Sequence, residues 1–161
     1  MGSFWRAIDW ISDKLKVAGA FCLAGMAFLT FADVVGRLFR HPLFGSREIV
    51  TFMATLAVAM ALPYTHKIKG HVGVEILVRL LSEKTQKIVD ICTGILSLGL
   101  FAIVTWRMTT YAHTMQASGE VSMNLALPTH YIIYATGFCL LIFTFVILHD
   151  IIDDIRKVTS K

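Results

Sequence analysis

Residues 131–148 read YIIYATGFCLLIFTFVIL and form the longest stretch of the chain without a charged side chain or histidine. The apolar core continues back to Val121, interrupted only by His130. Three more uncharged runs lie upstream: VAGAFCLAGMAFLTFA (17–32), IVTFMATLAVAMALPYT (49–65) and ICTGILSLGLFAIVTW (91–106). A helix needs about 20 mostly apolar residues to cross the hydrocarbon of a bilayer, and the neighbours of each run extend it to that length. The pattern predicts an all-α integral membrane protein with four transmembrane helices.

The composition of the 161-residue chain favours the same fold class. Only 16% of the residues are charged and the mean hydropathy is +0.68. This composition poorly suits the alternative, a soluble all-helical bundle with buried helices. The formal net charge of +4 suits a surface of anionic membrane lipid and argues against nucleic acid as a partner.

The positive charges between the runs predict the orientation, because lysine and arginine resist translocation across the membrane. We expect both termini and the middle connection to face the cytoplasm, with short connections near residues 38–46 and 110–127 on the outer side. Eleven charges lie on the cytoplasmic side: Arg6, Lys14, Lys16, Lys67, Lys69, Arg79, Lys84, Lys87, Arg156, Lys157 and Lys161. Four lie on the outer side: Arg37, Arg40, Arg47 and Arg107.

We expect a single four-helix membrane domain over residues 1–161, with two amphipathic helices at the membrane surface. In the second of these, Glu75 and Arg79 form a pair one helical turn apart. The predicted elements are an interfacial helix at about 3–16, transmembrane helices at about 15–39, 47–66, 83–112 and 126–150, and a surface helix at about 71–81. Small residues four apart, such as Ala20 and Ala24, permit close helix approach without identifying the partner.

Charged residues near membrane depth are expensive and are usually paired or functional. Asp33 and Arg37 stand one turn apart near the outer end of the first predicted transmembrane helix, and Arg40 continues that side. After the turn HPLFG (41–45), we expect Ser46 to cap the next helix and Glu48 to lie within reach of an arginine. The favoured interpretation is an ion-pair clasp between two helices; the alternative is direct handling of an ion or substrate.

The middle third of each predicted span lacks the charged residue or glycine–proline break that a stand-alone ion-coupled transporter needs. A phosphate-binding glycine loop, a zinc motif and an arranged nucleophile and base are also missing from the sequence. Cys22, Cys92 and Cys139 fall inside apolar runs, where they act as small hydrophobic residues. We therefore expect no enzyme activity and no cofactor in this chain, and a function that depends on a partner.

Two segments and the four-helix layout together resemble the small membrane subunit (DctQ-like, or Q subunit) of tripartite ATP-independent periplasmic (TRAP) transporters. The segments are DVVGRLFRHPLFGSREIV (33–50) and ALPYTHKIKGHVGVEIL (61–77). The resemblance is carried by the pair Asp33 and Arg37, by the turn from Pro42 to Glu48, and by a run that begins at Pro63. That run continues through Gly70, His71, Val72 and Glu75.

The resemblance implies a subunit bound to a much larger multi-span membrane subunit, which carries the sodium and substrate sites and moves as an elevator. It further implies a periplasmic solute-binding protein that delivers an organic acid anion, and a place in the bacterial inner membrane. Where the family has an acidic residue beside Glu48, this chain has Arg47. The candidate partner-interface or ion-pair residues are Asp33, Arg37, Arg40, Arg47, Glu48, His71 and Glu75.

The leading hypothesis is therefore a non-catalytic scaffold for the large elevator subunit during sodium-driven uptake. We expect the first two transmembrane helices to pack against that subunit, the surface helix to hold the assembly level in the membrane, and the outer charges to touch the binding protein.

Two alternatives remain open. A haem-binding electron carrier would use paired imidazoles, with His66 and His149 on the inner side, and His41, His113 and His130 on the outer side. A small homo-oligomeric drug exporter would need a membrane-buried carboxylate, for which Asp33 and Asp90 are the candidates.

Overall fold

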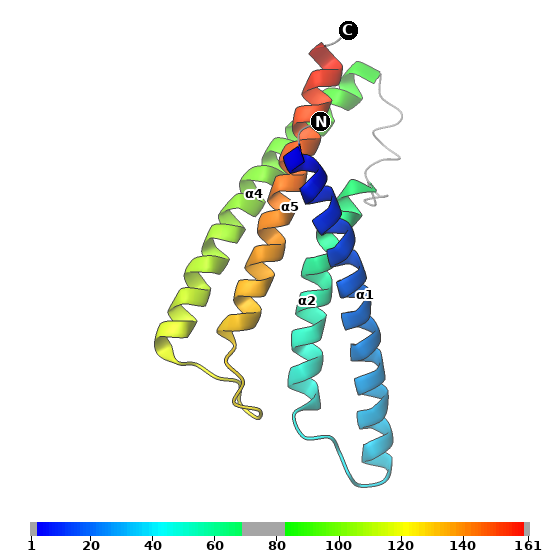
Figure 1. Cartoon of the computed structure of the whole chain (residues 1–161), viewed down its shortest axis with the longest axis vertical. Coiled ribbons are helices and arrows are strands. Elements are labelled where there is room, and N and C mark those ends of the chain that lie inside the picture. The colour runs from blue at the N-terminus through cyan, green and yellow to red at the C-terminus, as the bar shows by residue number, and fades with distance from the viewer. Residues whose placement is uncertain (1–2, 69–82, 160–161) are drawn as a thin grey trace.

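A computed structural model describes residues 3–68 and 83–159, which form four long helices (Figure 1). The helices are α1 (Ser3–Leu38), α2 (Ser46–Lys67), α4 (Glu83–Ser118) and α5 (His130–Thr159). Each contains a stretch long and apolar enough to cross a membrane. Within the described ranges the only β-type pairing is an isolated bridge between Val121 and Pro128. The chain is thus an all-α membrane protein with four spanning helices, and the predicted fold class is confirmed.

The helices form two antiparallel hairpins, α1 with α2 and α4 with α5, and α2 packs on α5 to join them. In Figure 1 the hairpins converge near the chain termini and diverge toward their connecting loops. We call the first region the terminal end. The second region, with the connections 39–45 and 119–129, is the loop end.

The core lies around α5. Its span is 44% buried, against 6% for α4, because its sequence is apolar on every face. Phe143 and Ile147 of α5 pack with Leu62 of α2 and with Leu98 and Phe101 of α4. The rings of Phe101 and Phe143 meet edge to face at 4.6 Å. The outer faces of α1 and α4 keep large apolar side chains exposed, as expected of surfaces that meet hydrocarbon.

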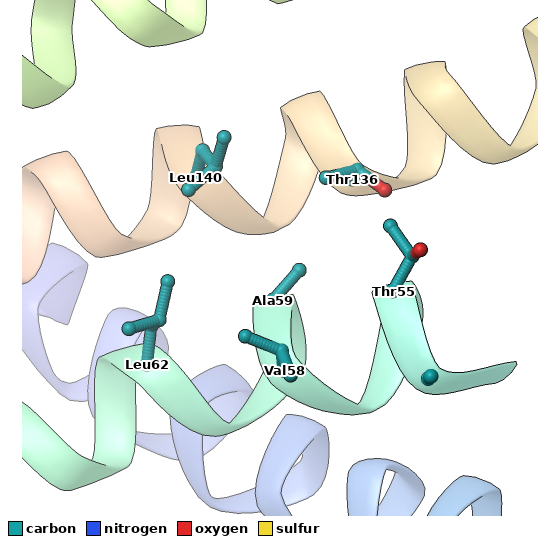
Figure 2. A pocket seen from close by; sticks show the side chains of 7 residues that line it. Thr55, Val58, Ala59, Leu62, Thr136 and Leu140 are labelled. Carbon is teal, nitrogen blue, oxygen red and sulfur yellow. The ribbon is translucent and has the colours of Figure 1, made fainter. Parts of the chain in front are cut away.

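A groove of about 410 Å³ lies between α2 and α5. In Figure 2 the side chains of Thr55 and Ala59 on α2 point toward Thr136 and Leu140 on α5. The middle of the uncharged run 49–65 therefore lies beside the first half of the run 131–148. The remaining lining residues are Ala54, Val58 and Leu62.

Contacts with α5 set the height of α4 in the bundle. Thr105 Oγ1 lies 3.4 Å from Thr144 Oγ1, and a Cβ on Gly137 would lie 3.8 Å from Met108 Cβ. Arg107 is therefore level with residues 137–144, the middle of the uncharged run of α5. The sequence predicts a helix that ends at about 112, with Arg107 near its outer end. In the structure α4 continues to Ser118, so Arg107 lies farther from the end of the helix than predicted.

Several helix ends also differ from the prediction. The predicted interfacial helix 3–16 is continuous with the first transmembrane helix, because both lie within α1, and the Ser12 hydroxyl donates to the carbonyl of Ile8 at 2.9 Å. α4 continues to Ser118, beyond the predicted end at 112. α5 begins at His130, later than the predicted start at 126, because Ala126 has a positive φ of 51° and ends a turn. The predicted surface helix 71–81 lies outside the described residues.

The close approach of α1 and α2 depends on Gly19. A Cβ at this position would lie 3.2 Å from Met60 Cβ and 3.3 Å from the carbonyl oxygen of Ala57. Ala20 and Ala24, which the spacing rule singled out, are exposed. On α2 the contact includes Ala57 and Ala61, a pair of small residues four apart, whereas on α1 it is made by Gly19, one position before Ala20.

We predict that Gly19→Val lowers the free energy of unfolding in detergent by about 1–3 kcal/mol, because the added methyl groups force α1 away from α2. Gly99→Val is the matched control, since nothing lies within 4 Å of a Cβ at Gly99 on α4. Equal stability of the two variants in a chemical unfolding titration would contradict the assigned helix contact.

Candidate functional site

The connection between α1 and α2 is organised by Asp33, a buried carboxylate near the end of α1. Its Oδ2 accepts hydrogen bonds from Arg37 Nε at 2.9 Å and forms an ion pair with Arg37 Nη2 at 2.8 Å. Its Oδ1 accepts the backbone N–H of Leu43 at 3.1 Å. The hydroxyl of Ser46, the first residue of α2, bonds to the same carboxylate. Asp33 thus ties the turn and the start of α2 to α1, and the pair with Arg37 forms as predicted.

The turn requires two residues with positive φ and a glycine whose backbone lies close to a neighbouring carbonyl group. Arg40 and Gly45 have φ values of 61° and 73°. His41 donates its N–H to the carbonyl of Gly36 at 2.8 Å, and a Cβ on Gly36 would lie 2.5 Å from the carbonyl oxygen of His41. The predicted cap is wrong, because Gly45 occupies the N-cap position of α2 and makes no side-chain capping bond. The Ser46 hydroxyl is used by Asp33 instead.

Glu48 joins the two hairpins at the loop end. Its Oε1 accepts the backbone N–H of Asn124 at 2.8 Å and the side-chain amide of Asn124 at 2.9 Å. Its Oε2 accepts the Ser122 hydroxyl at 2.9 Å and the backbone N–H of Leu125 at 3.1 Å. The sequence predicted an arginine partner for Glu48. In the structure this carboxylate instead accepts four hydrogen bonds from the 119–129 connection.

The 119–129 connection is folded to present those donors. Ser122 N–H donates to the carbonyl of Leu127 at 2.9 Å, and Leu127 N–H returns a bond to the Ser122 hydroxyl at 3.2 Å. The Leu125 side chain then lies over Gly45, where a Cβ would come within 2.5 Å of it. Glycine at position 45 is therefore required twice, by its positive φ and by this contact.

Exposed cations and apolar side chains surround the hydrogen bonds between Glu48 and the 119–129 connection. Arg40 and Arg47 are exposed, and Phe44 and Met123 leave 76% and 99% of their surface uncovered. A hollow of about 250 Å³ lies among the turn, Arg47 and Asn124. Arg47 carries its charge into solvent beside Glu48 rather than pairing with it. We call Arg40, Arg47, Phe44 and Met123 the loop-end surface, which has the mixed basic and apolar character of a protein-binding patch.

The terminal end is held by a second set of contacts. Lys67 Nζ of α2 lies 3.0 Å from Asp9 Oδ1 of α1, and Lys16 Nζ lies 3.8 Å from the centre of the Tyr64 ring. His66 Nε2 lies 3.4 Å from Asp150 Oδ2 of α5. These contacts tie α1, α2 and α5 together at the opposite end from Glu48.

The two inner-side histidines of the haem-carrier alternative each contact other side chains. His66 lies against Asp150 and Phe143, whereas the ring of His149 is tilted against that of Trp5, with ring centres 4.5 Å apart. Of the two carboxylates in the exporter alternative, Asp33 is bonded to Arg37 and to the turn, and Asp90 is exposed near the start of α4.

Of the seven predicted site residues, three make contacts that shape the loop end, two are exposed there, and two lie outside the described residues. Asp33, Arg37 and Glu48 organise the loop end, Arg40 and Arg47 lie exposed on it, and His71 and Glu75 lie outside the described residues. Sequence reasoning missed Ser122, Asn124 and Leu125. Their only signal was the pair of polar residues Ser122 and Asn124 within the otherwise apolar segment VSMNLALP (121–128), which ends in proline.

Comparison with known protein families gives one result. The model for "Tripartite ATP-independent periplasmic transporters, DctQ component" matches residues 26–157, which include the Asp33 and Glu48 contacts. No significant match was found among curated proteins or among solved structures.

We predict that Glu48→Gln loosens the 119–129 connection. Glutamine offers one acceptor oxygen and turns an N–H₂ group toward the loop's own donors, so that part of the four-bond set is lost. Chymotrypsin should then cleave faster after Leu125, which is half-buried in the native protein, and the thermal midpoint in detergent should fall.

Arg47→Gln is the matched control, because it neutralises the adjacent exposed residue and leaves the four hydrogen bonds of Glu48 intact, so it should be cleaved at the native rate. Cleavage of Glu48→Gln at that same rate would show that Glu48 does not hold the connection.

Proposed function

Because the chain belongs to the DctQ family, the small membrane component of TRAP transporters, we propose that it scaffolds a large elevator subunit during sodium-driven uptake of an organic acid anion. A periplasmic solute-binding protein would deliver that anion. Membership in the family and four spanning helices together make the chain a multi-pass protein of the inner membrane.

The observation that carries the scaffold role is that the bundle is tied at both ends. Glu48 joins the hairpins at the loop end through four hydrogen bonds. At the terminal end, Lys67 with Asp9 and His66 with Asp150 join three helices. A subunit that must stay still while its partner moves gains from fixed ends, because relative motion of its own hairpins would absorb the partner's displacement.

The lining of the groove between α2 and α5 favours a substrate site on the partner subunit over one in this chain. An organic carboxylate needs cations or free donors, yet the only polar side chains lining the groove are Thr55 and Thr136. Their hydroxyls already donate to the carbonyls of Thr51 and Ile132, at 2.9 and 2.8 Å. We therefore assign both substrate and sodium to the large subunit.

The orientation expected from the positive charges would place the loop end in the periplasm. The loop-end surface would then face the binding protein, with Arg40 and Arg47 attracting an acidic patch and Phe44 and Met123 supplying apolar contact.

Reconstitution in liposomes tests the division of labour. We expect the purified chain alone to give no sodium-driven uptake, and the chain with its large subunit and loaded binding protein to transport an organic acid anion. Uptake by the solitary chain at a rate comparable to that of the full system would contradict the scaffold role.

We predict that the double variant Arg40→Glu and Arg47→Glu weakens binding of the substrate-loaded binding protein by about tenfold at low salt, mainly through a slower association rate. Arg156→Glu is the matched control, since Arg156 is exposed at the terminal end. Surface plasmon resonance on the nanodisc-embedded complex measures both rates. Equal association and dissociation rates for the double variant and Arg156→Glu would show that the loop-end surface does not contact the binding protein.

A further inference from the structure

Arg107 lies at the middle depth of the bundle. The segment 105–109 of α4 faces residues 137–144 of α5, and α5 in turn faces the centre of the uncharged run of α2 across the groove. The charged groups that bound the span lie far from this level on both sides. Asp33, Arg37 and Glu48 mark the loop end, and the Asp9–Lys67 ion pair marks the terminal end.

The side chain of Arg107 points away from the rest of the chain. The face of α4 that packs on α5 contains Phe101, Thr105 and Ala112, and Ala112 has no exposed surface. Arg107 is about half a helical turn round from that face and is exposed. Among the described residues, no hydrogen bond or ion pair involves its guanidinium.

An unpaired guanidinium at mid-depth is costly in hydrocarbon, and such residues almost always face a protein interior and a partner group. Snorkelling moves a charge only by the length of its own side chain, whereas Arg107 is several turns from either end of the span. The residues in line with it on α4 are apolar or small: Leu100 and Ile103 are each 60% exposed, Leu96 is 73% exposed, and a Cβ on nearby Gly99 would meet nothing within 4 Å. This face therefore carries an exposed apolar strip that ends in one exposed cation, Arg107.

We propose that the α4 strip of Leu96, Leu100, Ile103 and Arg107 is the surface on which the large membrane subunit docks, through a transmembrane helix that presents a carboxylate to Arg107. The identity of the partner rests on the proposed function; the need for an acidic partner rests on the position of Arg107. The proposal moves the main contact from α1 and α2, where the sequence had suggested it, to α4, the least buried of the four spans.

Co-purification of the two subunits in mild detergent tests the docking surface. We expect Arg107→Leu to weaken association by at least about tenfold, and Arg107→Lys to retain part of it because the charge remains. Arg47→Leu is the matched control and should leave association unchanged, because Arg47 lies at the loop end. A photo-crosslinking residue at Ile103 should capture the large subunit, and Arg107→Leu should abolish that adduct.

Thermal stability of the chain purified alone separates docking from folding. We expect Arg107→Leu to be at least as stable as the native chain, because it removes an unpaired charge. A loss of stability there would show that the charge has a partner within the chain, and would overturn the proposal.

Native-strength association of Arg107→Leu would also overturn the proposal. Failure of the native chain itself to bind the large subunit would instead overturn the proposed function.

Discussion

The arrangement of the two hairpins depends on the carboxylate of Glu48. The two hairpins diverge from the terminal end toward the loop end, so a further contact is needed there to fix their separation (Figure 1). Glu48 supplies the missing restraint by filling both oxygens with donors from the 119–129 connection. Hydrogen bonds to an ionised group are among the stronger ones, and two of the four come from backbone N–H groups that would otherwise need water.

The same residue depends on the turn beside it. Glu48 reaches the connection only because α2 begins at Ser46, and α2 begins there because Asp33 holds Leu43 and Ser46 against α1. Gly45 then admits the Leu125 side chain, which only a residue without a Cβ allows. The contacts of Glu48 therefore depend on those of Asp33. Asp33 fixes the start of α2 and Glu48 fixes the second hairpin to it, so that both loops behave as one surface.

Features set by local spacing were predictable from the sequence, and features set by the packing of distant segments were not. Four uncharged runs sufficed for four spans, and an aspartate and arginine one turn apart sufficed for the Asp33–Arg37 pair. Glu48 and its partners are 74 to 77 residues apart, so no spacing rule links them. Arg107 is the clearest case. The sequence predicts a helix end at about 112, but α4 continues to Ser118, and the contact of Thr105 with Thr144 makes Arg107 level with the middle of α5.

The contrast between Arg47 and Arg107 suits the two proposed partners, the binding protein and the large subunit. Arg47 is exposed at the loop end, where water screens it, and it can attract an acidic protein surface without a fixed counter-ion. Arg107 is level with the middle of the uncharged run of α5, and in hydrocarbon its charge would need a specific group at that height. The first kind of site favours the brief contacts of a delivering protein, and the second favours permanent association. α5, the most buried of the four spans, packs against the helices that carry both sites.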